Sequence, residues 1–258
     1  MNTQSILNLQ ASAARPNSIE AMLARAQPFN DLRTDALNRL ARRARTLRSR
    51  SRDYLFRAND SAHSLYVVVQ GHIALLRQST PGRERVLGLR GPGEMLGEDA
   101  LISDAPHVMS ARAVTNALCI GISREAAVRE FENAPRLARG LLRCLSSGNC
   151  ALERQIGSLG LQSGLERVAS YLMRQIPLGM EDACDVELHC PKWMIASMLD
   201  LTKESFSRLL RQLADAELIV TRGRTIHVFK PARLATLCAR GHSCVRCWGC
   251  PRGGAWVA

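Results

Sequence analysis

The feature that most constrains the fold is a pair of short helical segments joined by a tight turn near the C-terminus. In the second segment apolar residues recur at i, i+3, i+4 and i+7, the spacing of a buried helix stripe: Phe206, Leu209, Leu210 and Leu213. Thr202 can cap this helix, and the turn Asp200–Thr202 separates it from a first helix over Lys192–Leu199. We expect the buried side of the first helix to carry Trp193, Ile195, Ala196 and Leu199. Helix, short turn and helix match a helix-turn-helix.

The opposite face of the second helix carries side chains suited to reading bases. An acid, a hydroxyl and two guanidiniums follow the same spacing: Glu204, Ser207, Arg208 and Arg211. Arginine can bond O6 and N7 of guanine, glutamate can accept from N4 of cytosine, and serine can take either role. Thr202 and Lys203 stand at the positive end of the helix, where phosphates bind. An ordinary helical hairpin with a solvated face has the same spacing, so this pattern alone leaves both interpretations open.

The segments around this pair predict a small sheet. ELIVTRGRTIHVF indicates two short strands around the turn Arg222-Gly223-Arg224, which is a wing whose two arginines would touch backbone phosphates. In CDVELHCP the alternation of Val186 and Leu188 indicates an edge strand. A helix is also expected over 164–175.

The N-terminal half has a different texture. Residues 1–18 are polar and small, and a helical pattern interrupted at Pro28 runs from Ile19 to Leu47. From Tyr54 to Ser123, short apolar runs are punctuated by glycine and proline at intervals of about ten residues, a pattern typical of antiparallel sheets. A small β-barrel or sandwich is therefore predicted.

A long helix is predicted between these two parts. Asn133 can cap it and Pro135 suits its first turn. Its apolar positions step by three or four residues, close to a coiled-coil seam: Leu137, Leu141, Leu145, Gly148, Leu152, Ile156 and Leu159. Gly148 would allow two backbones to approach closely. The seam favours a homodimer, and the alternative is a helix packed on its own barrel.

Charge points to an anionic partner. The net charge is +12, from 35 Lys+Arg against 23 Asp+Glu, and nucleic acid is the commonest partner of such a surface. The stretch from Arg39 to Arg57 has many arginines and a single acid, Asp53, and is either a solvated basic surface or a phosphate-facing one. No apolar run reaches the roughly 18 residues of a membrane span, and the start lacks the pattern of a signal peptide. A cytoplasmic protein with no membrane partner is expected.

The nine cysteines are odd in number and crowd towards the end of the chain. In a cytosolic protein they argue against a disulfide framework. The last four follow the pattern C-x5-C-x2-C-x2-C: Cys238, Cys244, Cys247 and Cys250. Four thiolates can hold an iron–sulfur cluster or zinc, and a tail with incidental cysteines binds neither. No nucleophile–base set, phosphate loop or G-x-S-x-G is present, so an enzyme is not expected.

From about Leu47 to Leu234 the sequence resembles the Crp/Fnr superfamily of bacterial transcription regulators, through GPGEMLGEDAL and LTKESFSRLLRQLADAELIVTRGRTIHV. The resemblance implies an α+β protein with a cyclic-nucleotide-binding-like β-barrel (jelly roll) over 47–132. A dimerisation helix over 133–162 and a winged helix-turn-helix over 163–235 would follow. Residues 1–46 would be an N-terminal tail and helix, and 236–258 a Cys-rich tail. The implied partners are double-stranded DNA, a second copy of the chain and RNA polymerase.

The reading helix is similar to that of the Fnr-like branch, which includes nitric-oxide regulators. Glu204, Ser207 and Arg208 match its motif, which implies a palindrome with TTGAT-like half-sites. Two positions depart from the family pattern. Lys203 stands where arginine is usual, and lysine cannot form arginine's two-bond fork. Asp200 stands where glycine is common, which leaves the geometry of the turn open.

The resemblance argues against cyclic AMP as the signal. Gly97-Glu98 are present, but His107 and Val108 fall where the family's phosphate-binding Arg-Ser would be. Leu152 and Glu153 fall at the positions of its adenine-contacting pair. The N-terminal cysteines of Fnr itself are absent, because no cysteine precedes Cys119.

Three cofactors therefore remain open: an iron–sulfur cluster or zinc on the tail cysteines, or haem in the barrel region. Candidate haem ligands are His63, His72 and His107. The sequence predicts a redox- or gas-responsive activator. The alternatives are a cyclic-nucleotide-responsive regulator and a cyclic-nucleotide-domain scaffold without DNA readout.

Overall fold

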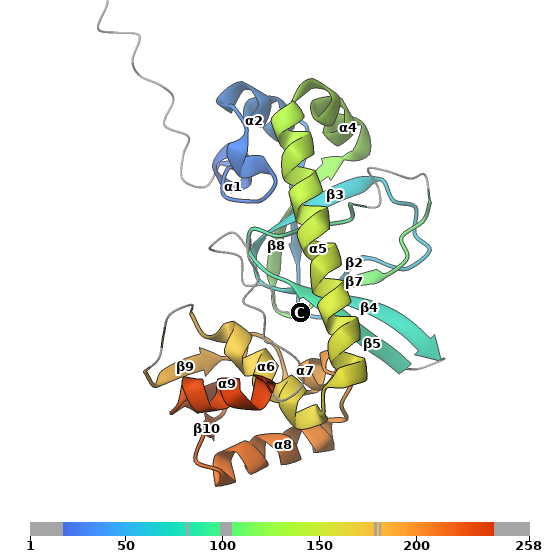
Figure 1. Cartoon of the computed structure of the whole chain (residues 1–258). Coiled ribbons are helices and arrows are strands. Elements are labelled where there is room, and N and C mark those ends of the chain that lie inside the picture. The colour runs from blue at the N-terminus through green and yellow to red at the C-terminus, as the bar shows by residue number, and fades with distance from the viewer. Residues whose placement is uncertain (1–17, 81–82, 99–104, 178–179, 181, 240–258) are drawn as a thin grey trace, which may run out of the picture.

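The computed structural model of the chain describes residues 18–80, 83–98, 105–177, 180 and 182–239. An N-terminal β-sandwich carries helices at one end, and one long helix connects it to a C-terminal unit of helices and a small sheet (Figure 1). Within the described ranges, no helix is long and apolar enough to cross a membrane.

The chain begins with three short helical elements. These are α1 (Ile19–Leu23), the 3-10 turn η1 (Phe29–Asp31) and α2 (Thr34–Ala41). The helical pattern predicted to continue to Leu47 is wrong in its last part. Residues from Ala44 onward form strand β1 (Ala44–Ser49), because their backbone pairs with strand β8. Long-range pairing here overrides the local helical spacing.

The sandwich consists of two four-stranded antiparallel sheets. The first has the order β1, β8 (Ala117–Ser123), β3 (Ser64–Gln70) and β6 (Met95–Leu96). The second has the order β2 (Tyr54–Phe56), β7 (Ser110–Ala113), β4 (Ile73–Thr80) and β5 (Arg83–Arg90). Phe56, Val68 and Ile73 pack between the sheets. The predicted jelly-roll-like fold is confirmed, although the two sheets do not close into one continuous barrel.

Helices cover the outer face of the first sheet. Leu65, Val67 and Ile120 pack beneath α1, α2, α4 (Arg124–Asn133) and the long helix α5 (Pro135–Leu161). Asn133 does not cap α5 as predicted. It ends α4, its amide donates to the carbonyl of Arg129 at 2.6 Å, and Ala134 takes the cap position.

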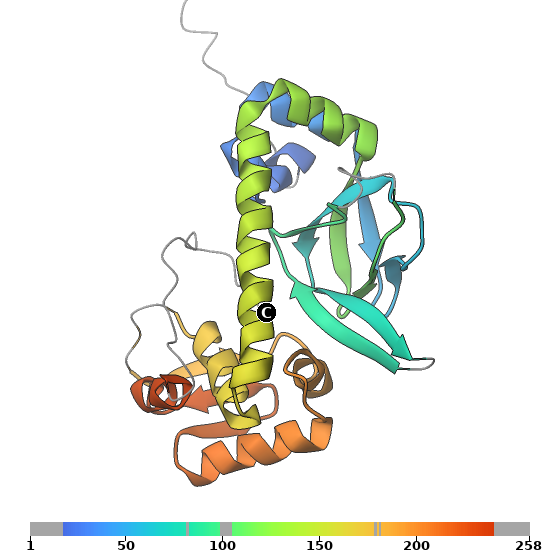
Figure 2. The same ribbon diagram turned by 45° about the vertical axis from the view of Figure 1, so that its right-hand side comes forward.

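Helix α5 runs from the N-terminal helices to the C-terminal unit (Figure 2). The predicted seam is divided between two environments. Leu137 and Leu141 are buried within their own chain, and a Cβ on Gly140 would lie 2.7 Å from Cβ of Pro28. The expectation that the first two leucines face a partner is therefore wrong. Further along, Leu152 is 55% exposed and Ile156 is 71% exposed.

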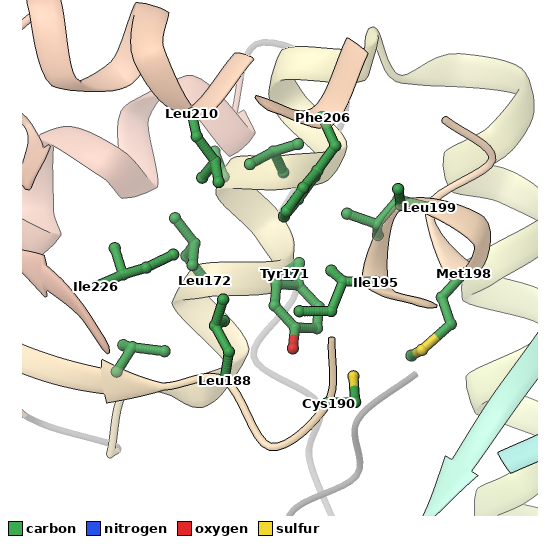
Figure 3. Packing of buried hydrophobic residues seen from close by; sticks show 14 of the residues in the cluster. Tyr171, Leu172, Leu188, Cys190, Ile195, Met198, Leu199, Phe206, Leu210 and Ile226 are labelled. Carbon is green, nitrogen blue, oxygen red and sulfur yellow. The ribbon is translucent and has the colours of Figure 1, made fainter. Parts of the chain in front are cut away.

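The C-terminal unit follows α5 directly. It contains α6 (Gly164–Gln175), β9 (Cys184–Glu187), α7 (Lys192–Met198), α8 (Lys203–Asp215), β10 (Ile219–Arg222), β11 (Thr225–Val228) and α9 (Pro231–Ala239). The sheet order β10-β11-β9 leaves β9 at an edge, as predicted. Tyr171, Ile195 and Phe206 lie at the centre of its core (Figure 3).

Contacts between the sandwich and this unit include apolar packing of Leu76 and Val86 in the same cluster as the core of the unit, as well as polar and ring contacts. The backbone amide of Val86 donates to Oγ of Ser197 at 3.0 Å. Nη2 of Arg85 lies 2.9 Å from Oδ1 of Asp200. The rings of His72 and His189 stack with their centroids 5.2 Å apart. Strands β4 and β5 of the sandwich therefore pack directly against the helix-turn-helix.

Candidate nucleic-acid interface

The position of α8 is fixed by its cap and its apolar stripe. Oγ1 of Thr202 accepts a hydrogen bond from the backbone amide of Ser205 at 3.1 Å. Phe206, Leu210 and Leu213 are buried in the core, which sets the rotation of the helix about its axis. Figure 3 shows Phe206 and Leu210 within this core, and the polar face of α8 therefore points to solvent.

Every side chain of α8 that was predicted to read a base or to bind a phosphate lies on that exposed face. Lys203, Glu204, Ser207, Arg208 and Arg211 are all exposed. Within the described residues, neither Arg208 nor Arg211 forms an ion pair with a carboxylate. Their guanidiniums can therefore donate to acceptors on a partner, and no carboxylate of the described residues competes for these hydrogen bonds.

Thr202 has a structural duty in addition to its predicted phosphate contact. Besides accepting from Ser205, its hydroxyl lies 3.0 Å from Oγ of Ser205 and donates to it. A phosphate would have to compete for that proton, so the contribution of Thr202 is chiefly the N-cap.

The turn before α8 accommodates its unusual aspartate. Asp200 has φ +55°, the left-handed conformation that aspartate tolerates better than most residues. Its carboxylate pairs with Arg85, and the amide of Leu201 donates to the carbonyl of Ala196 at 2.8 Å. The departure from glycine is therefore compatible with a tight turn, and it also supplies a contact to the sandwich.

The prediction that Trp193 is buried is wrong. Its side chain is 44% exposed, and Met194 and Met198 occupy the core together with Ile195 and Ala196. The predicted burial of Ile195, Ala196 and Leu199 is confirmed, and Met194 and Met198 fill the part of the core that was assigned to Trp193.

The predicted wing is present. Strands β10 and β11 pair through Arg222 and Thr225, and the turn between them contains Gly223 with φ +62°. Both Arg222 and Arg224 are exposed. The carbonyl of Arg224 accepts from the amide of Leu188 at 2.8 Å, which holds the turn against the edge of the sheet.

Two residues beside α8 were not predicted from the sequence. Lys192 and Thr221 line a hollow of about 360 Å³ together with Ser207 and Arg211. Lys192 stands at the first position of α7, where the helix dipole and its own charge both favour an anion. The signal available in the sequence was a basic residue at the start of the first helix.

The tail cysteines are only partly within the described ranges. Cys238 belongs to α9, is 1% exposed, and donates from its thiol to the carbonyl of Leu234. Cys244, Cys247 and Cys250 lie outside the described residues.

The three candidate haem ligands lie in different places. His63 is exposed, His72 contacts His189, and the buried His107 stacks on Phe56 with ring centroids 3.8 Å apart. In the part of the chain that the structure describes, no three His, Cys, Asp or Glu side chains gather as a metal site requires.

The residues around the family's nucleotide site do not fit a cyclic nucleotide. His107 packs against Phe56 where the phosphate-binding arginine was expected, and Val108 is 61% exposed. Leu152 and Glu153 are exposed on α5. The intervening residues 99–104 lie outside the described ranges. Nothing at the described positions supplies a charge-assisted fork for a phosphate.

A sandwich, a long helix and a winged helix-turn-helix in this order define a two-domain DNA-binding regulator. Residues 46–133 match the family model of the cyclic nucleotide-binding domain, and residues 166–237 match that of the Crp-like helix-turn-helix domain. The chain belongs to the Crp/Fnr family of transcription regulators, whose members are not enzymes.

Relatives from different branches are similarly distant. The chain is 27% identical to the Cyclic AMP receptor protein of Thermus thermophilus over 180 residues, which cover 70% of this chain and 82% of that protein. It is also 27% identical to the Nitrogen fixation regulation protein FixK of Rhizobium meliloti over 236 residues, which cover 88% and 98%. The fold is similar to the structure of FixK2 from Bradyrhizobium japonicum, with a TM-score of 0.67 and 24% identity over 75% of this chain and 96% of that one. Equal identity to two branches does not distinguish between their effectors.

Proposed function

We propose that the chain is a homodimeric regulator of the Fnr-like branch that reads TTGAT-like palindromes with α8. The observation that carries the proposal is the exposed face of Glu204, Ser207 and Arg208 on a helix whose rotation is fixed by Phe206 and Leu210. Such a helix can insert into the major groove without reorganising its own core. A contact with RNA polymerase is proposed from the resemblance to the family, as is a cytoplasmic location from the DNA target.

Base reading and phosphate binding are assigned to different elements. Arg208 on α8 is proposed to bond a guanine, whereas Arg222 and Arg224 on the wing are proposed to contact phosphates. Both groups are exposed arginines, so the assignment rests on which element carries them. Lys203 is proposed to bind a phosphate at the helix N-terminus.

Matched substitutions test this division. Arg208→Ala is expected to cost about 1–3 kcal/mol on the palindrome and to relax preference at one base pair. Arg224→Ala is expected to weaken all duplexes evenly and to reduce the slope of log affinity against log salt by about 1. Titrations of both variants against single-base variants of the palindrome measure this. A uniform loss for both variants would contradict the assignment.

The proposed dimer interface is the C-terminal half of α5. Leu152 and Ile156 are 55% and 71% exposed, and around Gly148 a Cβ would meet nothing within 4 Å. An exposed apolar stripe on a long helix is stabilised when a second copy covers it. Two-fold symmetry would also match a palindromic site.

The proposed signal is a gas or a redox change rather than a cyclic nucleotide. His107 and Val108 stand where a phosphate-binding Arg-Ser pair was expected, which supports a signal other than a cyclic nucleotide. The C-x5-C-x2-C-x2-C tail supports a gas or a redox change. We propose an iron–sulfur cluster on the tail cysteines, and the test below distinguishes it from zinc on the same cysteines and from haem in the sandwich.

Protein purified without oxygen provides the test of the signal. A broad absorption with bound iron and sulfide, lost in Cys247→Ser, is the expected result. Zinc in place of iron would make the tail a structural site, and a haem band retained in Cys247→Ser would move the sensor to the sandwich. Tight binding of cyclic AMP by calorimetry would overturn the proposal.

A further inference from the structure

The end of α7 and the turn after it lie against strand β5 of the sandwich (Figure 1). Nη2 of Arg85 lies 2.9 Å from Oδ1 of Asp200, and the amide of Val86 donates to Oγ of Ser197 at 3.0 Å. We call these four residues the β5 clasp. Ser197 is in the last turn of α7, and Asp200 lies in the turn that leads into α8. The β5 clasp therefore acts on the helix-turn-helix directly.

Strand β5 is the outermost strand of its sheet. The order β2-β7-β4-β5 leaves it with one neighbouring strand. A backbone amide that does not pair within a sheet needs another partner, and for Val86 this partner is the hydroxyl of Ser197. Val86 is 1% exposed and belongs to the same apolar cluster as Met194 and Met198 of α7. The contact thus combines a hydrogen bond, an ion pair and apolar burial.

Asp200 occupies a conformation that is less favourable for aspartate than for glycine. Its φ is +55°, in the left-handed region that glycine adopts without steric cost. Such backbone outliers persist where the surroundings enforce them, and they point to a use for the residue. Among the described residues, the ion pair with Arg85 is the only one that Asp200 makes. The contact with β5 gives a reason for a carboxylate at this position.

The C-terminal unit is attached to the rest of the chain by a covalent link and by contacts. Gln162 and Ser163 join α5 to α6 in extended conformations, with φ −108° and −64°, and rotation at such a link can swing one unit against another. Nε2 of Gln155 on α5 donates to the carbonyl of Met198 at 3.4 Å. The β5 clasp adds an attachment from the sandwich, and it restricts the rotation that the link alone would allow.

We infer that the β5 clasp fixes the angle at which α8 is presented, which makes Ser197 and Asp200 positioning residues for the half-site spacing that a dimer accepts. The inference rests on the proposed function and deepens it, because it assigns spacing and base reading to different residues. One added base pair moves a half-site by about 3.4 Å along the duplex and turns it by about 35°. A C-terminal unit held by the clasp can follow this displacement only by breaking the clasp. The free energy of the clasp therefore contributes to the discrimination between spacings.

The test measures the affinity of full-length protein for palindromes that differ only in the number of base pairs between the half-sites. The reference is the spacing that the wild type binds most tightly, and the comparison is with spacings one base pair longer and one shorter. The wild type should prefer the reference by at least about tenfold, because a displaced half-site loses contacts to α8.

Variants of the β5 clasp should reduce this preference. The ion pair is partly exposed, with 41% and 54% of the two side chains accessible, so Arg85→Gln should reduce the preference about two- to fivefold. Arg85→Gln/Ser197→Ala, which also removes the hydrogen bond to Val86, should reduce it by about tenfold.

Asp200→Asn tests the role of the carboxylate in two backgrounds. Asparagine tolerates the left-handed conformation as aspartate does, so the substitution removes only the charge. In the wild-type background it should lower the spacing preference, because it breaks the ion pair with Arg85. In the Arg85→Glu background it should raise the preference, because it removes the repulsion between two carboxylates. A role of Asp200 confined to the turn would give the same change in both backgrounds.

Two further variants serve as controls. Arg85→Lys keeps the positive charge and should retain most of the spacing preference. Arg129→Glu makes the same charge change as Arg85→Glu at an exposed position of α4, at the end of the molecule away from α8 (Figure 1), and should leave the preference unchanged. In every variant the base preference assigned to Arg208 should stay as in the wild type.

Three results would overturn the inference. They are equal wild-type affinity for the three spacings, a wild-type preference that survives in Arg85→Gln/Ser197→Ala, and the same effect of Asp200→Asn in both backgrounds. Each of these leaves the proposed function standing. Failure to bind the palindrome at any spacing would overturn the proposed function together with the inference.

Discussion

The two halves of α5 differ in what covers their apolar side chains. In the first half, Leu137 is fully buried against the N-terminal helices and the first sheet, and Gly140 touches Pro28. In the second half, Leu152 and Ile156 are exposed although they continue the same stripe. Helical spacing therefore identifies an apolar face of a helix, but it does not show what covers that face. Here one half packs within the chain, and the other half is exposed and is the face that we propose for a second copy.

The largest expected effect is on the exposed half. In the proposed dimer, Ile156→Glu would place two unpaired carboxylates against each other, which should cost about 4 kcal/mol or more and leave a monomer at micromolar concentration. Sedimentation measures the association. Glu153→Gln, which changes an exposed residue three positions before Ile156, is the control. A variant dimer as tight as the wild type would place the interface elsewhere.

Next in size is truncation in the buried half. Leu137→Ala should lower the free energy of unfolding by about 3 kcal/mol, through lost burial and a cavity beneath α1. Leu152→Ala, the matched change in the exposed half, should alter monomer stability by less than about 1 kcal/mol. Urea unfolding of both variants in the monomeric Ile156→Glu background gives the values. Equal losses of the free energy of unfolding in Leu137→Ala and Leu152→Ala would contradict the difference in burial between the two halves of α5.

Two of the four glycines of α5, one in each environment, test the same difference. A Cβ at Gly140 would lie 2.7 Å from Cβ and 2.9 Å from the carbonyl oxygen of Pro28, so Gly140→Ala should destabilise the chain by about 1–2 kcal/mol. Gly148→Ala meets open space and should stabilise a monomer by up to about 1 kcal/mol through helix propensity. Thermal unfolding distinguishes the two, and stabilisation by Gly140→Ala would contradict the packing against Pro28.

The smallest expected effect concerns the contact between His72 of the sandwich and His189 of the C-terminal unit. Burial, and secondarily the proximity of His189, lowers the pKa of His72 from its ordinary value of about 6.5. The folded state therefore favours neutral His72, and its contribution to stability is present above that ordinary value and lost as pH falls through it towards the lowered pKa. The melting temperature should fall on acidification below about pH 6.5, and less so in His72→Gln. The exposed His63→Gln is the control, and identical profiles for all three proteins would exclude a role for His72.

The reading helix could be predicted from the sequence because its determinants are local. The spacing of Phe206, Leu210 and Leu213 fixes both the buried stripe and, by exclusion, the polar face that carries Arg208. The exposure of Trp193 at the start of α7 could not be predicted, since it depends on how Met194 and Met198 fill the core. Similarly, the burial of Leu137 depends on helices more than a hundred residues earlier in the chain.

The remaining expectations depended on contacts between distant segments. Strand β1 was missed because its backbone is paired only by β8, about 70 residues later. Asn133 failed as a cap because α4 extends to that residue and its amide bonds within α4. The stacking of His107, in the segment before β7, on Phe56 of β2 is likewise a contact between residues far apart in the sequence.

The most direct test of the account is selection of bound sequences from a pool of random duplexes by full-length protein, without any assumed site. The account predicts enrichment of a two-fold symmetric pair of TTGAT-like half-sites, with loss of preference at one position of each half in Arg208→Ala. Two half-sites would show that a dimer binds, and the altered position would show which base Arg208 reads. Enrichment of an asymmetric single site, or no enrichment over the starting pool, would contradict the central claim that α8 of a dimer reads DNA sequence.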